Sequence, residues 1–250
     1  MNISIAAEPL FYIGSFAVTN TLVVTLGISL LIIAGSLILK KRISLVPRGF
    51  QNVVESVLEA LLNLADSVTQ DRRQSKKFFP LVATIFIFVI LSNWVEVLPG
   101  LGTIGLREAH EGKEILVPFL RSGSADLNFT LALAIVSVMS AQFLGIAAIG
   151  VGKYAGKFFV SPFHKPYFVG TFVGILEIVS EVAKLISFSF RLFGNIFAGE
   201  VLLMVMLFLV PYFVPLPFLF LELFVGFVQA LVFSMLTLVF LKMAVTEAAH

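Results

Sequence analysis

The sequence predicts an all-α polytopic membrane protein built as one membrane domain, residues 1–250. Hydrophobic residues make up 59% of the chain and charged residues 13%, and the mean hydropathy is +1.04, so the chain is far more apolar than a soluble domain. Uncharged stretches of about 20 residues, enough to cross the hydrocarbon core, recur along it. We expect about five membrane-spanning helices, an amphipathic surface helix and a long, tilted C-terminal helical hairpin.

The first half contains two spans and a surface helix. Residues 10–39 carry no charge and hold the first transmembrane helix with a short lead-in. In residues 49–77 the valines and leucines fall on one side of a helix and the acidic residues on another, which predicts an amphipathic helix on the cytoplasmic membrane surface. Residues 78–98 form the second span.

The second half contains a third span and the hairpin. Residues 127–152 form the third span. Residues 166–210 would be roughly 67 Å long as a helix, about twice the thickness of the hydrocarbon core, so we expect either a strongly tilted helix or a surface segment followed by a span. Residues 218–243 form the last helix. Three prolines mark the break before it: Pro211, Pro215 and Pro217.

The basic residues predict the orientation, because cytoplasmic loops hold the excess of Lys and Arg. Eight lie between residues 40 and 77, three between 153 and 165, and Lys242 adds one, against three in the 99–126 loop on the opposite side. We therefore expect the N-terminus outside and the C-terminus in the cytoplasm. The N-terminus lacks the basic region of a signal peptide, so we expect the first span to be retained.

Several functions are disfavoured by composition and motifs. A net charge of +2, spread over loops, does not suggest nucleic-acid binding. No cysteine is present, and neither a GxxxxGK[ST] phosphate loop nor an HExxH or GxSxG motif occurs. We expect no enzymatic activity of the chain on its own and no cofactor or metal.

The most informative residue is Arg191, which has no other formal charge between Lys184 and Glu200 in a strongly apolar segment. A guanidinium stays protonated, and placing it at mid-bilayer costs at least about 2.5 kcal/mol on insertion scales. A functional requirement is the leading interpretation. Snorkelling, or packing against a carbonyl group, is the structural alternative.

Further polar residues lie on the same helical face as Arg191 or on the opposite face. Five residues separated by 4, 3, 7 and 4 positions form one stripe along the helix: Glu177, Glu181, Lys184, Arg191 and Asn195. Glu200 lies nine residues past Arg191 and points to the opposite face, about 13.5 Å further outward. On the last helix Glu222 and Gln229 share a face, and Glu222 lies at a depth where it could meet Glu200.

This arrangement suggests an ion path in two offset halves, because intramembrane carboxylates mark relays or water-filled cavities. Glu177 and Glu181 stand toward the cytoplasm. Toward the outside stand Glu200, Glu222, Glu96 and Asn93. Arg191 lies between the halves, where it would repel a crossing cation and attract a carboxylate carried past on another subunit.

Structural alternatives remain open for these residues. Glu177, Glu181 and Lys184 could form an interfacial turn with an i,i+3 ion pair. The two outer glutamates could share a proton as a structural contact. Asn195 and Gln229 could be hydrogen-bonding glue between helices.

The run "RLFGNIFAGE" at 191–200 resembles the signature of subunit a of F-type ATP synthases, the membrane stator that works against the rotating c-ring. The resemblance continues through Glu177 and Ser180, and through three further runs: "SNWVEVLP" at 92–99, "SADLNFTLALA" at 124–134 and "QALVFSMLTLVFLKMA" at 229–244.

The resemblance implies a role for each position. Arg191 corresponds to the essential arginine that faces the c-ring carboxylate and prevents a short circuit. Glu177 and Ser180 match the inner half-channel. The outer half-channel is matched by Glu200, Glu222, Asn195, Gln229, Asn93 and Glu96. Both Glu200 and Glu222 are glutamates here, whereas some members have a histidine at one of the two positions, so sodium remains an alternative to the proton.

The function implied is that of a non-catalytic subunit that couples proton, or sodium, flow to rotation of the c-ring in an ATP synthase. Its expected partners are the c-ring, b-type peripheral stalk subunits and the lipid bilayer, in a bacterial inner membrane. A secondary ion-coupled transporter is the main rival, but it predicts two symmetric broken helices. Here the charges concentrate in one C-terminal hairpin.

Overall fold

The computed structural model describes residues 7–97, 105–110, 113–118, 121–152, 154, 169–210 and 213–246. Six long helices lie in this part of the chain: α1 (Asn20–Arg42), α2 (Phe50–Thr69), α3 (Arg72–Val97), α4 (Leu127–Ile149), α6 (Val169–Leu209) and α7 (Pro215–Thr246). All of them except α2 are long and apolar enough to cross a membrane. The predicted fold class is confirmed, and the chain is an integral membrane protein.

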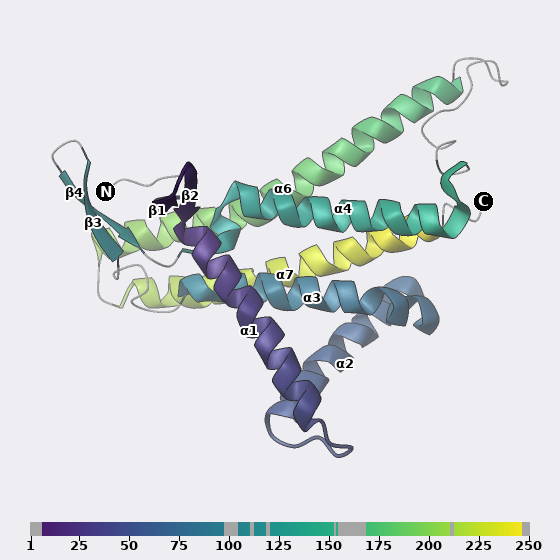
Figure 1. The fold of residues 1–250 in the computed structure, drawn as a ribbon, viewed down its shortest axis with the longest axis horizontal. Coiled ribbons are helices and arrows are strands. Elements are labelled where there is room, and N and C mark those ends of the chain that lie inside the picture. The colour runs from purple at the N-terminus through teal and green to yellow at the C-terminus, as the bar shows by residue number, and fades with distance from the viewer. Residues whose placement is uncertain are drawn as a thin grey trace.

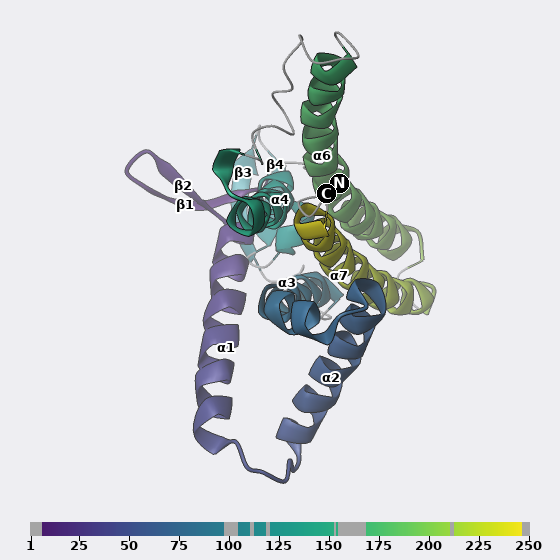
Figure 2. The ribbon, with the colours of Figure 1, turned by 90° about the vertical axis from the view of Figure 1, so that its right-hand side faces the viewer.

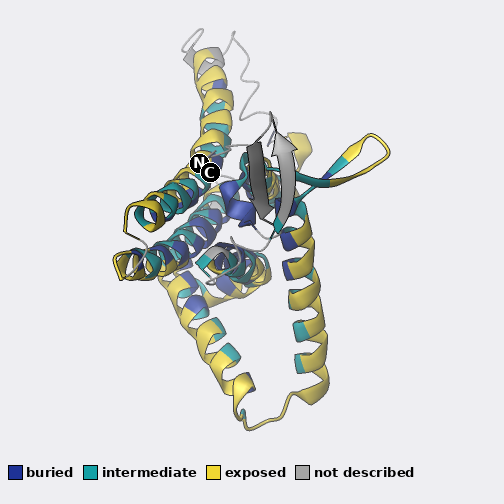
Figure 3. Cartoon of the chain, turned by 90° about the vertical axis from the view of Figure 1, so that its left-hand side faces the viewer, coloured by how far each residue is buried: buried dark blue, intermediate teal, exposed yellow. Residues whose placement is uncertain are grey.

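The helices form a bundle with two splayed arms (Figures 1 and 2). Helices α3, α4 and α7 run side by side along the long axis, and α6 crosses them at an incline. Helices α1 and α2 diverge from this bundle, and a loop joins their far ends. Figure 3 shows the consequence, because buried residues gather on the central helices while α1 and α2 stay mostly exposed. The turn between α6 and α7 lies at the opposite end of the bundle from the end of α7.

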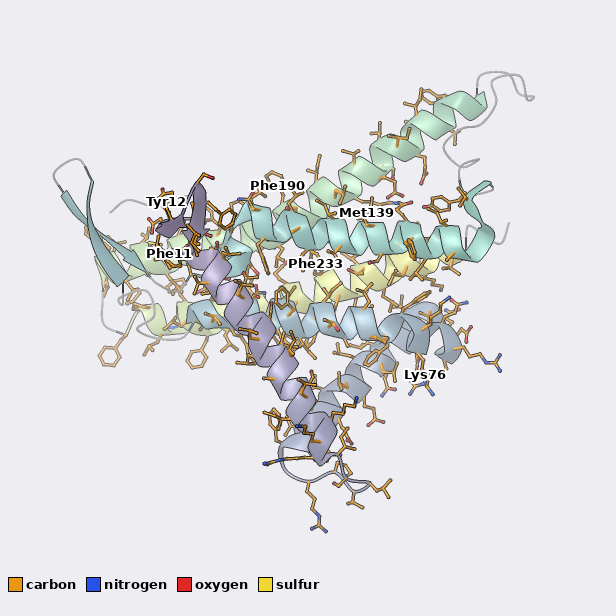
Figure 4. The ribbon with its side chains drawn as sticks, viewed as in Figure 1. Phe11, Tyr12, Lys76, Met139, Phe190 and Phe233 are labelled. Atoms are coloured by element: carbon orange, nitrogen blue, oxygen red, sulfur yellow. The ribbon has the colours of Figure 1, made fainter. Side chains whose placement is uncertain are left out.

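Apolar packing and a few hydrogen bonds between hydroxyl groups hold the bundle together. The Phe188 ring on α6 lies 4.4 Å from the Phe233 ring on α7, between centroids, and Phe233 points into the bundle in Figure 4. Thr130 on α4 and Ser189 on α6 are hydrogen-bonded at 3.1 Å. In lipid, where apolar contact alone gives little preference for another helix, such bonds and close packing select the partner helix.

The lead-in to α1 is a β-hairpin, which the sequence did not predict. Strand β1 (Pro9–Ile13) pairs antiparallel with β2 (Phe16–Thr19). Aromatic and β-branched residues flank a two-residue turn, and Gly14 supplies the positive φ of 65° that this turn requires. Helix α1 therefore begins at Asn20, ten residues after the predicted start of the span. A second hairpin, β3 (Gly105–His110) and β4 (Lys113–Pro118), lies in the polar loop after α3.

The predicted surface helix 49–77 differs from the structure at its C-terminal end. Helix α2 stops at Thr69, because Gln70 adopts a left-handed conformation with φ of 58° and caps the helix. Asp71 then accepts a hydrogen bond from the backbone N–H of Arg73 and starts α3. The basic residues that follow belong to α3, and Figure 4 shows Lys76 extending away from the bundle.

This corner also carries a half-buried acidic group outside the membrane spans, Asp66. Asp66 forms an ion pair with Arg72. A hydrogen bond with Ser75 is the main cause that holds the pKa of Asp66 below its usual value, and the charge and hydrogen bond of Arg72 act in the same direction.

The C-terminal hairpin is built from two long helices. Helix α6 runs 41 residues without interruption, which is about 61 Å, and its incline relative to α4 is visible in Figure 1. Of the two forms expected for residues 166–210, the structure has the single long helix. Helix α7 begins at Pro215, because proline is accommodated in a first helical turn. Pro211 lies outside the described residues.

Candidate functional site

A buried turn just before α4 brings a charged side chain into the bundle. Ser122 caps the short helix η2 (Gly123–Ala125), and its hydroxyl group donates to the Ser92 carbonyl oxygen of α3 at 2.9 Å. Gly123 is required here, since a Cβ at this position would lie 2.9 Å from the Thr25 hydroxyl oxygen on α1. The turn packs against helices α1, α3, α4 and α6, and Arg121, which precedes it, is only 7% exposed.

Arg121 is the partner of Glu200. Its terminal nitrogen donates to Glu200 Oε2 at 3.0 Å, and its Nε donates to the same oxygen at 3.3 Å. Both side chains are largely buried. Removing one member of such a pair typically costs about 3 to 5 kcal/mol, because the other charge is then left without compensation.

Glu222 is a second carboxyl group near this pair. We call Arg121, Glu200 and Glu222 the outer cluster, after the half-channel predicted for the two glutamates. Glu222 is 6% exposed, and neither of its oxygens has a hydrogen-bond partner among the described residues. Its carboxyl group packs against the backbone of α6, where a Cβ added to Gly199 would lie 2.9 Å from Glu222 Oε1. The structure therefore brings Glu200 and Glu222 to neighbouring positions at the contact of α6 and α7.

Helix α3 contributes a neutral polar side chain one turn further along α7. Asn93 is buried, and its amide nitrogen donates to the Gly226 carbonyl oxygen at 2.9 Å. Its Oδ1 is buried without a partner among the described residues. The neighbouring Trp94 donates its indole N–H to the Leu223 carbonyl oxygen at 3.1 Å. These bonds fix α3 against α7 beside Glu222.

Two other predicted outer residues have fewer constraints. Gln229 is half-buried on α7, two turns after Glu222. Glu96 lies in the last turn of α3, and its side chain lies outside the described part of the chain.

Arg191 lies on a different surface from the outer cluster. It is exposed on α6, while Leu192 and Ile196 beside it are buried in the core. Its terminal nitrogen donates to the Ser187 hydroxyl group at 3.3 Å. Among the described residues no carboxylate forms an ion pair with it. Asn195, one turn later, is also exposed.

The surface around Arg191 is lined with small residues. At spacings of three or four residues along α6, four exposed positions lie on its stripe: Ala183, Ser187, Gly194 and Ala198. Small side chains allow another helix to approach the backbone closely. The guanidinium is thus presented on a face suited to close helix contact.

The N-terminal half of α6 carries the i,i+3 ion pair that was the structural alternative for Glu181 and Lys184. Lys184 Nζ lies 2.8 Å from Glu181 Oε1 and 5.5 Å from the centre of the Phe240 ring. This pair lines a cavity of about 20 Å³, together with Gln142 and Tyr154, which is room for one water molecule. Glu177 and Ser180 are half-buried nearer the start of the helix. Along α6, Glu177 and Glu200 are about 34 Å apart.

Arg121 is the residue that sequence reasoning missed. In the sequence it is one of three basic residues of a polar loop, and no spacing rule connects it to Glu200, which is 79 residues away. The available signal was the serine and glycine run that follows it, which is typical of a tight turn before a helix. In the described residues no group of three or more His, Asp or Glu side chains is arranged to hold a metal.

The fold and the site together define a class of protein: a polytopic membrane protein whose C-terminal hairpin carries several charged side chains on two helices long and apolar enough to span a membrane. The sequence model of the family described as "ATP synthase A chain" matches residues 17–242.

Named relatives agree with this match. "ATP synthase subunit a" of Campylobacter jejuni subsp. jejuni serotype O:23/36 (strain 81-176) is 36% identical over 229 residues, which cover 89% of each chain. The protein of the same name from Campylobacter concisus (strain 13826) is 34% identical over 89% of this chain and 88% of its own. That of Moorella thermoacetica (strain ATCC 39073 / JCM 9320) is 29% identical over 93% of each chain. The chain belongs to the ATP synthase subunit a family.

Proposed function

We propose that this chain is the ion-translocating stator subunit of an ATP synthase membrane sector. As a member of the subunit a family it is a non-catalytic membrane component of that complex. In our proposal it provides two offset half-channels, and Arg191 between them faces a ring of c-subunits. Peripheral stalk subunits of the b type hold it still while the ring turns.

The observation that carries the proposal is the environment of Arg191. A permanent cation on an exposed, membrane-depth helix face is costly unless a counter-charge is supplied. Within the described chain its partner is a neutral hydroxyl group. A carboxylate that arrives on another subunit supplies the missing charge, and the small residues around Arg191 favour the close approach this needs.

The half-channels follow from the positions of the other polar residues. Glu200, Glu222, Asn93 and Gln229 form the outer half-channel, to which Asn195 and Glu96 also belong. Glu177 and Ser180 form the inner one, close to the small cavity beside Glu181. The excess of Lys and Arg in the loops on the side of the C-terminus makes that side cytoplasmic.

The mechanism then has three steps. A proton enters from outside by way of Glu200 and Glu222 and passes to a c-ring carboxylate, which becomes neutral and moves into the lipid. The ring turns almost a full circle before this site meets the inner half-channel. The proton then leaves past Glu177, and the ionised carboxylate pairs with Arg191. Each charge that crosses releases about 2.3 kcal/mol per 100 mV of membrane potential.

The test compares wild type with Arg191→Ala in membrane vesicles that hold the assembled complex. We expect loss of ATP-driven pumping and of ATP synthesis, together with a passive proton leak through the membrane sector. Phe190→Ala is the matched control, because Phe190 is the exposed neighbour on the same helix and carries no charge. Retained coupled pumping in Arg191→Ala would give this arginine only a structural role and would refute the proposed function.

A further inference from the structure

The outer cluster contains one cation and two carboxyl groups, and only one of these carboxyl groups is paired within the described residues. Arg121 donates twice to Glu200 Oε2, whereas Glu222 has no hydrogen-bond partner there. The two glutamates lie at adjacent points of the contact between α6 and α7. Their environments therefore differ, although the residues are identical in type.

Because of this difference, we expect the two carboxyl groups to have different charge states. A buried carboxylate is stable as an anion when a cation donates hydrogen bonds to it. A buried carboxyl group without such a partner is far less costly in its neutral form. The repulsion between two neighbouring anions favours the same distribution.

We propose that Arg121 is a positioning residue of the outer half-channel, which holds Glu200 as a fixed anion so that Glu222 alone takes up and releases the translocated proton. This inference rests on the proposed function. The proton binds to a carboxylate oxygen of Glu222 and leaves from the same group, and Glu200 does not change its protonation state in the cycle.

The buried turn explains why Arg121 can do this. Ser122 is bonded to the end of α3, and η2 packs between helices, so the arginine is held at a fixed place rather than on a free loop. The charged and titratable groups facing Glu222 are Glu200 on α6 and, through Glu200, Arg121. Helix α3 presents Asn93, which is neutral, and the side chain of Glu96 lies outside the described residues.

The experiment measures ATP synthesis by the assembled complex in vesicles at constant membrane potential, while the pH on the side of the outer half-channel is varied. In Arg121→Gln the two carboxyl groups lose their cation and retain a shared proton to higher pH. We expect the alkaline limb of the pH profile to move upward by about one unit or more. Arg121→Lys keeps the charge, so its profile should stay close to that of wild type.

Three further variants make the result decisive. Arg121→Gln combined with Glu200→Gln removes one charge of each sign, so the profile should return toward wild type. Arg107→Gln, a change at another arginine of the same loop, should leave it unchanged. An unshifted profile in Arg121→Gln overturns the proposal. A loss that is equal at every pH, or is not relieved in the double variant, also overturns it and gives Arg121 a purely structural role.

Arg191→Ala in the same vesicles separates this inference from the function on which it rests. If Arg191→Ala abolishes coupling while Arg121→Gln has the wild-type profile, only the role of Arg121 is refuted. If Arg191→Ala keeps coupled pumping, the proposed function itself fails.

Discussion

Gly199→Ala is the substitution for which the structure gives the most direct estimate. The new Cβ would lie 2.9 Å from Glu222 Oε1 and 3.4 Å from its carboxyl carbon. Restoring an ordinary contact requires the carboxyl group to move by about 0.5 Å. Proton transfer needs a donor–acceptor distance of about 2.6 to 3.2 Å, so a displacement of this size is large enough to disturb the transfer of a proton to or from Glu222.

The effect on stability should be small, which separates it from the effect on transport. Alanine is more favourable than glycine in a helix by about 1 kcal/mol. Overpacking costs about 1 to 3 kcal/mol, and the low end applies because the displaced atom is the end of a side chain with rotatable bonds. The two terms nearly cancel. We expect assembly at the wild-type level and a fall of about tenfold in pumping and synthesis, since a misplacement of about 1 Å can cost roughly a hundredfold.

The assay is ATP-driven pumping and potential-driven ATP synthesis in vesicles, normalised to the amount of assembled complex. Gly27→Ala is the matched control, because a Cβ at Gly27 on α1 meets nothing within 4 Å. Wild-type rates in an assembled Gly199→Ala complex would refute the argument that the Glu222 carboxyl group must lie where the structure has it.

Three further substitutions test the surroundings of the site. Asn93→Ala removes the bond to Gly226; thermal unfolding in detergent should show a loss of about 1 kcal/mol, and pumping should slow because α3 no longer fixes α7 beside Glu222. Ser137→Ala removes the 2.8 Å bond to Thr237, and we expect a loss of about 0.6 kcal/mol with unchanged pumping. The pKa of Asp66 is lower in the folded chain than its ordinary value of 3.8. Its charge therefore stabilises the fold at any pH above 3.8, and this contribution is lost as the pH falls through the lowered pKa. The difference in melting temperature between wild type and Asp66→Asn should be present at pH 7 and vanish in acid.

Much of the fold was predictable because a bilayer imposes simple length rules. Uncharged segments of sufficient length became helices, and the family resemblance found on residues 191–200 is confirmed by the family match. The β-hairpin before α1 was not predictable by these rules, since an apolar aromatic run reads equally well as the start of a span. The end of α2 was missed because it depends on one left-handed residue, Gln70, and not on any change in the apolar period.

The site was predictable only where its residues share a helix. Periodicity relates Arg191 to Asn195 and separates both from Glu200, because the geometry of one helix fixes their directions. It gives no information on contacts between distant segments. The pairing of Arg121 with Glu200 depends on a buried turn whose position is set by its packing against helices α1, α3, α4 and α6.

Two ion pairs neutralise four of the charged side chains inside the bundle. Arg121 cancels Glu200, and Lys184 cancels Glu181. Among the charged side chains that remain in the described part of the hairpin, Arg191 lies on the exposed face of α6 and Glu222 is buried at the contact of α6 with α7, and neither forms an ion pair with a described residue. A fixed cation needs a neighbouring anion, whereas a carboxylate can be neutralised by a proton. In the proposed function, Arg191 therefore pairs with the carboxylate of the ring, and Glu222 carries the proton that neutralises that carboxylate.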